Sequence, residues 1–144
     1  MNIPNFLEIS PALWTSGQPA PGDWSLLAGN GVEVVINLAA PNAPAYDVAE
    51  AKRVLDAGMQ YVALPVVWTA PKIEDFLLFE ALLKGCAGRL ALVHCAKNMR
   101  ASAFVYLFRV RNGEDETVAR RDLETIWSPD PIWDAFISQV VSSP

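Results

Sequence analysis

The stretch of the sequence best suited to chemistry is residues 94–102, HCAKNMRAS. His94 is the only histidine of the chain, and Cys95 is one of only two cysteines. A cysteine becomes a strong nucleophile where positive charge stabilises its thiolate. Arg100 supplies a planar guanidinium that matches two oxygens of a tetrahedral anion, and Lys97 adds a second positive charge. The pattern predicts a thiolate that faces an oxyanion pocket, with phosphorus as the expected electrophile.

Two apolar segments flank this stretch and are expected to position it. Leu90–Val93 predicts a short core strand, and Ala101–Val110 is apolar almost all round, which predicts a buried helix. A loop that runs from a strand into a helix N-terminus aims its free backbone N–H groups at one point, with the helix dipole behind them. We therefore expect the anion to be held by the loop residues Ala96, Lys97, Asn98, Met99 and Arg100.

The rest of the chain alternates between strand and helix patterns. Further strands are predicted at Phe6–Ile9, Leu13–Ser16, Val32–Leu38 and Gln60–Val66, and further helices at Pro21–Asn30, Asp47–Ala57, Ile73–Cys86, Asp115–Ile126 and Pro131–Val141. We expect Asp47 to cap its helix. The alternation predicts an α/β fold with a central, mostly parallel sheet flanked by helices, and residues 1–144 are expected to form a single domain.

Composition excludes several classes of protein. With 144 residues, 52% of them hydrophobic and 19% charged, intrinsic disorder is excluded. The net charge of −5 argues against a nucleic-acid partner, and no apolar run reaches the length of a membrane span. No signal peptide is visible at the N-terminus, so we expect a cytoplasmic protein with reduced cysteines. Two cysteines and one histidine are too few for a structural zinc site, and we expect neither a metal nor a cofactor.

Residues 94–102 resemble the signature of the cysteine-dependent protein tyrosine and dual-specificity phosphatases, which is His-Cys, five residues, Arg and then Ser or Thr. The segments TSGQP (15–19), VINL (35–38), GMQY (58–61) and LPV (64–66) resemble a bacterial branch of that superfamily, often labelled beta-lactamase hydrolase-like. The resemblance covers about residues 7–110. It implies a dual-specificity-phosphatase-like fold and a phosphorylated substrate, either a protein or a small molecule, with no role for nucleic acid or membrane.

The resemblance also implies a two-step mechanism. Cys95 attacks phosphorus while Arg100 and the loop amides hold the equatorial oxygens, and water then hydrolyses the phosphocysteine. Phosphotyrosine-like or small aryl phosphates are the expected substrates. His94 is expected to orient the loop through hydrogen bonds rather than to act as a base.

The chain departs from the family signature in two ways. Four residues instead of five separate Cys95 from Arg100, and the usual glycine is absent; Asn98 is the residue best able to adopt a left-handed conformation in its place. Ser102, one position beyond the family's Ser or Thr, is the candidate to stabilise the thiolate. This first departure concerns the loop itself.

The second departure concerns the general acid. The family carries an aspartate on the loop after the strand that contains Leu-Pro-Val, but residues 66–71 here are VVWTAP. The nearest carboxylates are Glu74 and Asp75 at the start of the next helix, and Asp75 is the predicted acid. The alternative is that both are helix N-terminal charges favoured by the dipole. Trp68 and Tyr46 lie on loops that could border the pocket or could simply pack. Cys86 is expected to be a core or surface packing residue, with a redox partner of Cys95 as the alternative.

Two other functions stay open at this level. A six-residue stretch from Cys95 to Arg100 is the length favoured by rhodanese-like sulfurtransferases, which would carry a persulfide on Cys95. The missing acid would also suit a phosphatase-like module that binds phosphorylated ligands with little turnover. Thiosulfate:cyanide and phosphatase assays, together with phosphate binding by Cys95→Ser, distinguish the three.

Overall fold

A five-stranded sheet forms the centre of the computed structural model, which describes residues 2–143. The strands are β1 (Leu7–Ser10), β2 (Leu13–Ser16), β3 (Val32–Asn37), β4 (Gln60–Ala63) and β5 (Leu90–His94), and their order across the sheet is β1-β2-β5-β3-β4. β2, β5, β3 and β4 are parallel to one another, and β1 is antiparallel to β2. The predicted α/β fold with a mostly parallel sheet is confirmed.

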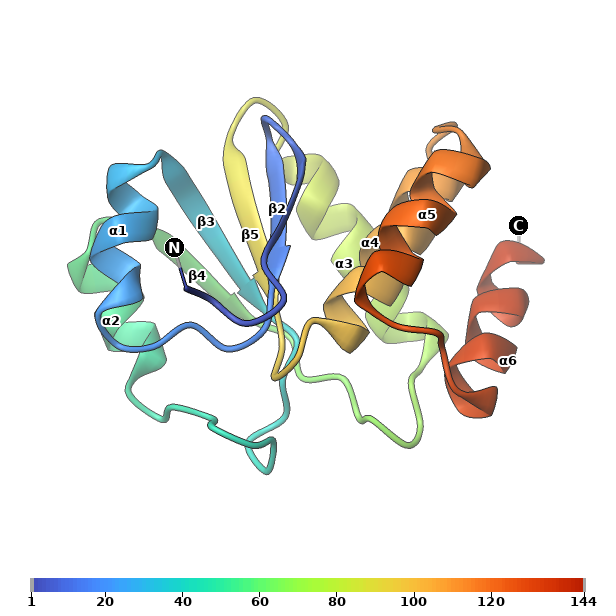
Figure 1. The fold of residues 1–144 in the computed structure, drawn as a ribbon, viewed down its shortest axis with the longest axis horizontal. Coiled ribbons are helices and arrows are strands. Elements are labelled where there is room, and N and C mark those ends of the chain that lie inside the picture. Colours follow the sequence, from blue (N-terminus) through green and yellow to red (C-terminus); the bar gives the residue numbers. More distant parts are fainter. Residues whose placement is uncertain (1, 144) are drawn as a thin grey trace.

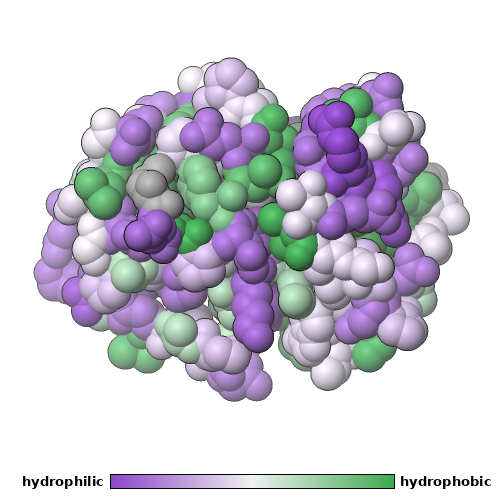
Figure 2. Space-filling view, viewed as in Figure 1, coloured by the Kyte–Doolittle hydropathy of each residue, from purple (hydrophilic) through white to green (hydrophobic). Residues whose placement is uncertain are grey.

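Six helices cover the two faces of the sheet (Figure 1). α1 (Asp23–Gly29) and α2 (Glu50–Asp56) lie on one face. On the other face lie α3 (Ile73–Gly85), α4 (Met99–Arg111), α5 (Glu116–Ile126) and α6 (Pro131–Val141). None of these helices has the length and hydropathy to cross a membrane. The outer side of α5 is covered with hydrophilic side chains (Figure 2).

Each face of the sheet buries its own apolar cluster, because successive strand residues point to opposite sides. In β5, Leu92 packs beneath α1 and α2 with Trp24, whereas Val93 packs beneath the other four helices with Phe104. The second cluster is the larger one and contains a chain of aromatic contacts that includes Phe76, Phe79, Phe104, Trp133 and Phe136. The sheet is thus fixed from both sides around its central strand.

The predicted bounds differ from the structure mainly at strand and helix ends. β4 ends at Ala63 instead of Val66, because Ala63 pairs with Asn37, the last residue of β3; beyond it only single hydrogen bonds remain, from the Leu64 and Val66 N–H groups to the Asn37 and Leu38 carbonyls. α2 begins at Glu50, and the prediction that Asp47 caps it was wrong. The Asp47 carboxylate instead accepts the Ala49 N–H ahead of the helix, at 2.9 Å.

The helix after Cys95 begins two residues earlier than predicted. α4 starts at Met99, so Arg100 lies in its first turn rather than before it. The prediction for α6 matches its observed bounds, and α5 begins at Glu116 with Asp115 as its N-cap, whose carboxylate accepts the N–H groups of Thr117 and Val118. The longer helices were therefore predicted more closely than α2 or β4.

Candidate active site

Cys95 lies directly after the central strand, where the carboxyl ends of three parallel strands meet. His94, the last residue of β5, pairs with Ser16 of β2 on one side and with Asn37 of β3 on the other. The Cys95 N–H donates to the Ser16 carbonyl at 3.3 Å. Ligands of open α/β sheets bind beyond these strand ends. The position predicted from the sequence is therefore the position at which such a fold builds a site.

The carbonyl groups of the Cys95–Arg100 loop are tied to other parts of the chain. The Ala96 carbonyl accepts the Gln18 N–H at 3.0 Å, and the Lys97 carbonyl accepts the Asn5 side-chain amide at 3.0 Å. The first amides of a helix have no intrahelical partner, so the first turn of α4 also offers donors here. With its carbonyls occupied, the loop leaves N–H groups as the polar backbone atoms available to an anion.

The shortened loop depends on Asn98. Asn98 has φ 66° and ψ 5°, the left-handed conformation that was predicted for it. Its side chain is fully buried and donates to the Asn5 carbonyl at 2.8 Å and to the Thr15 hydroxyl at 3.0 Å. Gly17 passes so close that a Cβ there would lie 2.8 Å from the Ala96 carbonyl oxygen. The segment before β1 and the turn after β2 therefore brace the loop from outside.

Arg100 is held close to the segment that follows β4. Its side chain is buried, and Nη1 donates to the Val66 carbonyl at 3.0 Å. This bond uses only one of the five N–H groups of the guanidinium and leaves the rest of the fork for a ligand. Lys97 is exposed. The two cations predicted to attract an anion thus differ: one is fixed and the other projects into solvent.

A cleft of about 530 Å³ brings these groups together. The loops that contain residues 40–44 and 67–69 form its two sides and lie at the lower edge of the molecule in Figure 1, where the space-filling view is notched (Figure 2). Its lining is Ala40, Asn42, Ala43, Pro44, Val67, Trp68, Thr69, Cys95, Ala96, Lys97, Met99 and Arg100. The walls are mostly apolar, and the only charges among these residues are the two cations.

The structure leaves the other candidates outside this lining. Asp75 is half-buried in the first turn of α3, and its neighbour Glu74 is exposed. Tyr46 packs against the core on the α4 side of the sheet. The Ser102 hydroxyl donates to the Met99 carbonyl at 3.0 Å and accepts the Trp127 indole N–H at 3.1 Å. Of the two aromatic candidates, only Trp68 borders the cleft.

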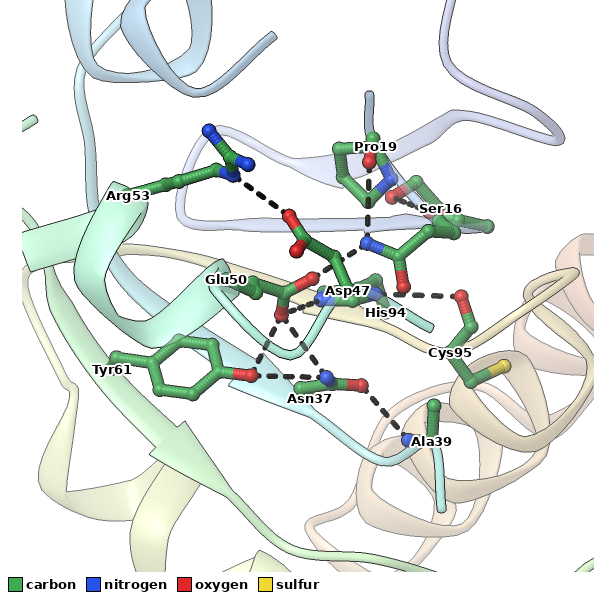
Figure 3. Close-up of polar contacts among 12 residues, drawn as sticks. Ser16, Pro19, Asn37, Ala39, Asp47, Glu50, Arg53, Tyr61, His94 and Cys95 are labelled. Atoms are coloured by element: carbon green, nitrogen blue, oxygen red, sulfur yellow. Dashed lines mark hydrogen bonds and ion pairs between the residues drawn. The ribbon is translucent and has the colours of Figure 1, made fainter. Parts of the chain in front are cut away.

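Glu50 is the functional candidate that the sequence did not reveal. It is the first residue of α2 and is 2% exposed. Its carboxylate accepts hydrogen bonds from the side-chain amides of Gln18 (2.6 Å) and Asn37 (3.0 Å) and from the Tyr61 hydroxyl (2.7 Å), and Oε2 lies 2.8 Å from His94 Nε2 (Figure 3). The other ring nitrogen of His94 lies 3.3 Å from the Cys95 carbonyl oxygen.

These contacts decide the ionisation of the carboxylate. Burial alone would raise the pKa of Glu50, but the hydrogen bond and charge of His94, with the bonds from Gln18 and Tyr61, lower it overall. Burial and the bond to Glu50 raise the pKa of Tyr61, which stays a donor. A buried, ionised carboxylate therefore contacts His94, the residue directly before the predicted nucleophile.

Cys86 lies far from these groups in the fold. It follows the last residue of α3, is half-buried, and lines a separate hollow of about 590 Å³ against β4. Burial raises the pKa of its thiol, although Arg89 acts in the opposite direction. Both cysteines are free thiols. Within residues 2–143, no cluster of three His, Cys, Asp or Glu side chains is arranged to hold a metal ion.

Comparison with known sequences gives one family. Residues 5–130 match the family described as DSP-PTPase phosphatase fused to NAD+ kinase (PTP-NADK). No curated protein matches the chain.

Among solved structures, the chain is similar to a DUF442 phosphatase-type protein from Shewanella putrefaciens CN-32. The two are 35% identical with a TM-score of 0.86, over 98% of this chain and 93% of that one. Tk-PTP in its active form is 16% identical with a TM-score of 0.80, over 95% and 96% of the two chains. TpbA of P. aeruginosa in complex with pTyr is 16% identical with a TM-score of 0.68, over 96% and 91%. The last two comparisons bear on the fold alone.

Proposed function

Because the chain belongs to the dual-specificity type of protein tyrosine phosphatase (DSP-PTPase) family, we propose that it hydrolyses phosphate monoesters with Cys95 as the nucleophile. The observation that carries this proposal is the shared cleft of Cys95 and the buried Arg100. The Ala96 and Lys97 carbonyl groups of the loop between them accept hydrogen bonds from other parts of the chain. Carbonyl oxygens that pointed into the cleft would repel a tetrahedral anion, so this arrangement suits anion binding.

The proposed reaction has two displacements at phosphorus. The Cys95 thiolate forms a bond to phosphorus while the bond to the leaving oxygen breaks, and that oxygen takes the electron pair and a proton. Water then attacks the phosphocysteine, the S–P bond breaks, and inorganic phosphate and the thiolate are released. Arg100 and the loop amides hold the equatorial oxygens through both steps.

The source of the proton in the first step separates two classes of substrate. A positioned acid contributes roughly 10²–10⁴-fold, mostly for poor leaving groups. Asp75 stays the predicted acid, although the twelve cleft residues include no carboxylate. This lining favours substrates whose leaving oxygen departs without full protonation, such as aryl phosphates. Trp68 offers an aromatic wall for such a group.

Hydrolysis of p-nitrophenyl phosphate by the purified protein tests the proposal. The wild type is expected to turn over, Cys95→Ser is expected to be inactive, and Cys86→Ser serves as the matched control. Vanadate, which mimics pentavalent phosphorus, should inhibit competitively. No turnover across pH 5–8 would overturn the proposal, and thiocyanate formation from thiosulfate and cyanide would replace it with sulfur transfer.

Asp75→Asn and Glu74→Gln test the acid by comparison with each other. If Asp75 protonates the leaving oxygen, Asp75→Asn loses activity steeply with alkyl phosphates and little with p-nitrophenyl phosphate, and Glu74→Gln loses neither. Equal and small effects of the two substitutions would remove Asp75 from the mechanism.

The absence of a carboxylate from the cleft lining also favours a second candidate, a module that binds phosphorylated ligands without turnover. Calorimetry with a phosphotyrosine peptide and Cys95→Ser measures this binding. Micromolar binding together with negligible hydrolysis by the wild type would favour the module over the enzyme.

A further inference from the structure

The buried Glu50 carboxylate has no role in the proposed reaction, yet side chains from several elements of the fold bind it. Three donors from β2–α1, β3 and β4 converge on it in addition to His94. Burying an ionised carboxylate is unfavourable unless hydrogen-bond donors and positive charge replace its lost hydration. A well-packed apolar side chain would fill the same space without that cost, so packing alone does not account for a carboxylate.

The surroundings of His94 indicate its protonation state. Nδ1 faces the Cys95 carbonyl oxygen, which can only accept, and Nε2 faces the Glu50 carboxylate, whose two oxygens already accept the side-chain amides of Gln18 and Asn37. Both ring nitrogens must therefore donate, which only the imidazolium can do. The Trp24 ring, with its centroid 5.7 Å from that of His94, adds an aromatic face beside the cation.

We propose that Glu50 is a positioning residue for the nucleophile, which holds His94 as an imidazolium that donates to the Cys95 carbonyl. The imidazolium fixes the Cys95 peptide and places a full positive charge one residue from the sulfur, so that it stabilises the thiolate. This inference rests on the proposed function for its purpose. The residue acts from α2, on the face of the sheet opposite to the cleft, and reaches the sulfur only through His94.

Other charged groups also act on the thiolate. Arg100 and Lys97 face the cleft together with Cys95, and Tyr61 reaches His94 only through the shared carboxylate. Because these groups are unchanged in a Glu50 variant, a change in thiolate stability can be assigned to the Glu50–His94 pair.

The first test uses the fact that His94 is the only histidine of the chain. Long-range ¹⁵N–¹H correlation spectra of the uniformly labelled wild type report this one imidazole without assignment. Both ring nitrogens are expected to be protonated at pH 7, where a free imidazole is mostly neutral. A neutral tautomer at pH 7 would overturn the proposal.

The second test measures the thiolate directly. In a Cys86→Ser background, the rate of alkylation by iodoacetamide as a function of pH reports Cys95 alone. Glu50→Gln is expected to move the midpoint upward by about one pH unit, or roughly tenfold in the thiolate equilibrium. Tyr61→Phe, the matched control, removes one donor to the same carboxylate and keeps its charge, so its midpoint should stay unchanged.

Kinetics with p-nitrophenyl phosphate separate positioning from ligand binding. Glu50→Gln is expected to lower kcat about tenfold while KM changes less than threefold, because the groups that bind phosphate are intact. An unchanged alkylation midpoint in a folded Glu50→Gln protein would reduce Glu50 to a structural role. If that variant does not fold, the wild-type spectra still decide the matter. Neither the spectra nor alkylation needs turnover, so their outcome is independent of the phosphatase proposal.

Discussion

The two faces of the sheet are built differently at the point where β5 ends. On the face of α1 and α2, His94 and Glu50 are sealed from solvent within a polar network (Figure 3). On the face of α3–α6, Cys95 borders a mostly apolar cleft in which Trp68 is 37% exposed. His94, the last residue of β5, and Cys95, which follows it, thus enter opposite environments. The sealed face, which contains His94 and Glu50, can keep its side chains in fixed positions. The open face, which contains the cleft beside Cys95, can admit a ligand.

This difference separates the tasks that a cysteine enzyme must combine. A thiolate needs fixed charges and dipoles nearby, whereas a substrate needs space and exposed contacts. Polar groups held in a water-excluded environment act more strongly than the same groups in water. The division predicts that substitutions on the open face change ligand handling, and that those on the sealed face change the nucleophile or the stability of the fold.

The largest expected effect is at Cys95. Cys95→Ser should lower kcat for p-nitrophenyl phosphate by at least ~10³-fold, because the serine hydroxyl is not ionised at neutral pH. Cys86→Ser, on the separate hollow beside β4, should leave kcat and KM unchanged. Equal activity of wild type and Cys95→Ser would show that the cleft is not where hydrolysis occurs.

The next effect is at Arg100. Arg100→Lys keeps the charge but loses the planar fork and the bond to the Val66 carbonyl, so kcat/KM should fall roughly 10²–10³-fold. Lys97→Gln removes the exposed cation and should cost less than about fivefold. Similar losses at both positions would mean that net charge, rather than the fixed guanidinium, binds the anion.

A smaller effect is expected at the wall of the cleft. Trp68→Ala should raise KM for p-nitrophenyl phosphate about tenfold, as expected for one lost aromatic contact, and leave kcat near the wild-type value. The backbone carbonyl of Trp68, which accepts the Trp133 indole N–H at 2.9 Å, remains in place. A KM that does not change would place the aryl group of the substrate elsewhere.

The smallest effect concerns stability on the sealed face. Because the pKa of Glu50 is lowered in the fold, its contribution is fully present above its ordinary value of 4.5 and is lost as pH falls through the lowered value. The free energy of unfolding of the wild type, measured with urea, should therefore fall as pH drops below about 4.5. Glu50→Gln should flatten this part of the pH dependence, and Glu74→Gln should leave it unchanged.

The sequence predicted the cysteine loop, the parallel strands and the long helices because their signals are local. The Cys95–Arg100 loop follows an apolar strand within a few residues, and Asn98 fills the only left-handed position the short loop requires. β4 was predicted too long because its pairing ends where its partner β3 ends, at Asn37, which the residues of β4 alone do not reveal. α2 was predicted too early since the Asp47 side chain forms a turn before the helix begins.

Glu50 could not be found in the same way. It meets His94 across 44 residues and Gln18 across 32, and a glutamate at the start of a helix is ordinary for local reasons. The available signal was weaker: Asn37 follows three buried apolar residues, 34–36, at the end of β3 and needs a buried partner. The pairing of β3 with β5 places Asn37 beside His94, and only this pairing shows that the two residues share a site.

The bond between Trp133 and the Trp68 carbonyl has a consequence for how this fold can diversify. The position of the cleft wall is set from α6, which contributes neither the nucleophile nor any lining residue. Exchange of α6 and the segment before it by recombination could therefore alter the preferred ligand. The Cys95–Arg100 loop and the buried Glu50–His94 pair would stay intact. Selection could in this way change substrate choice and reaction chemistry independently.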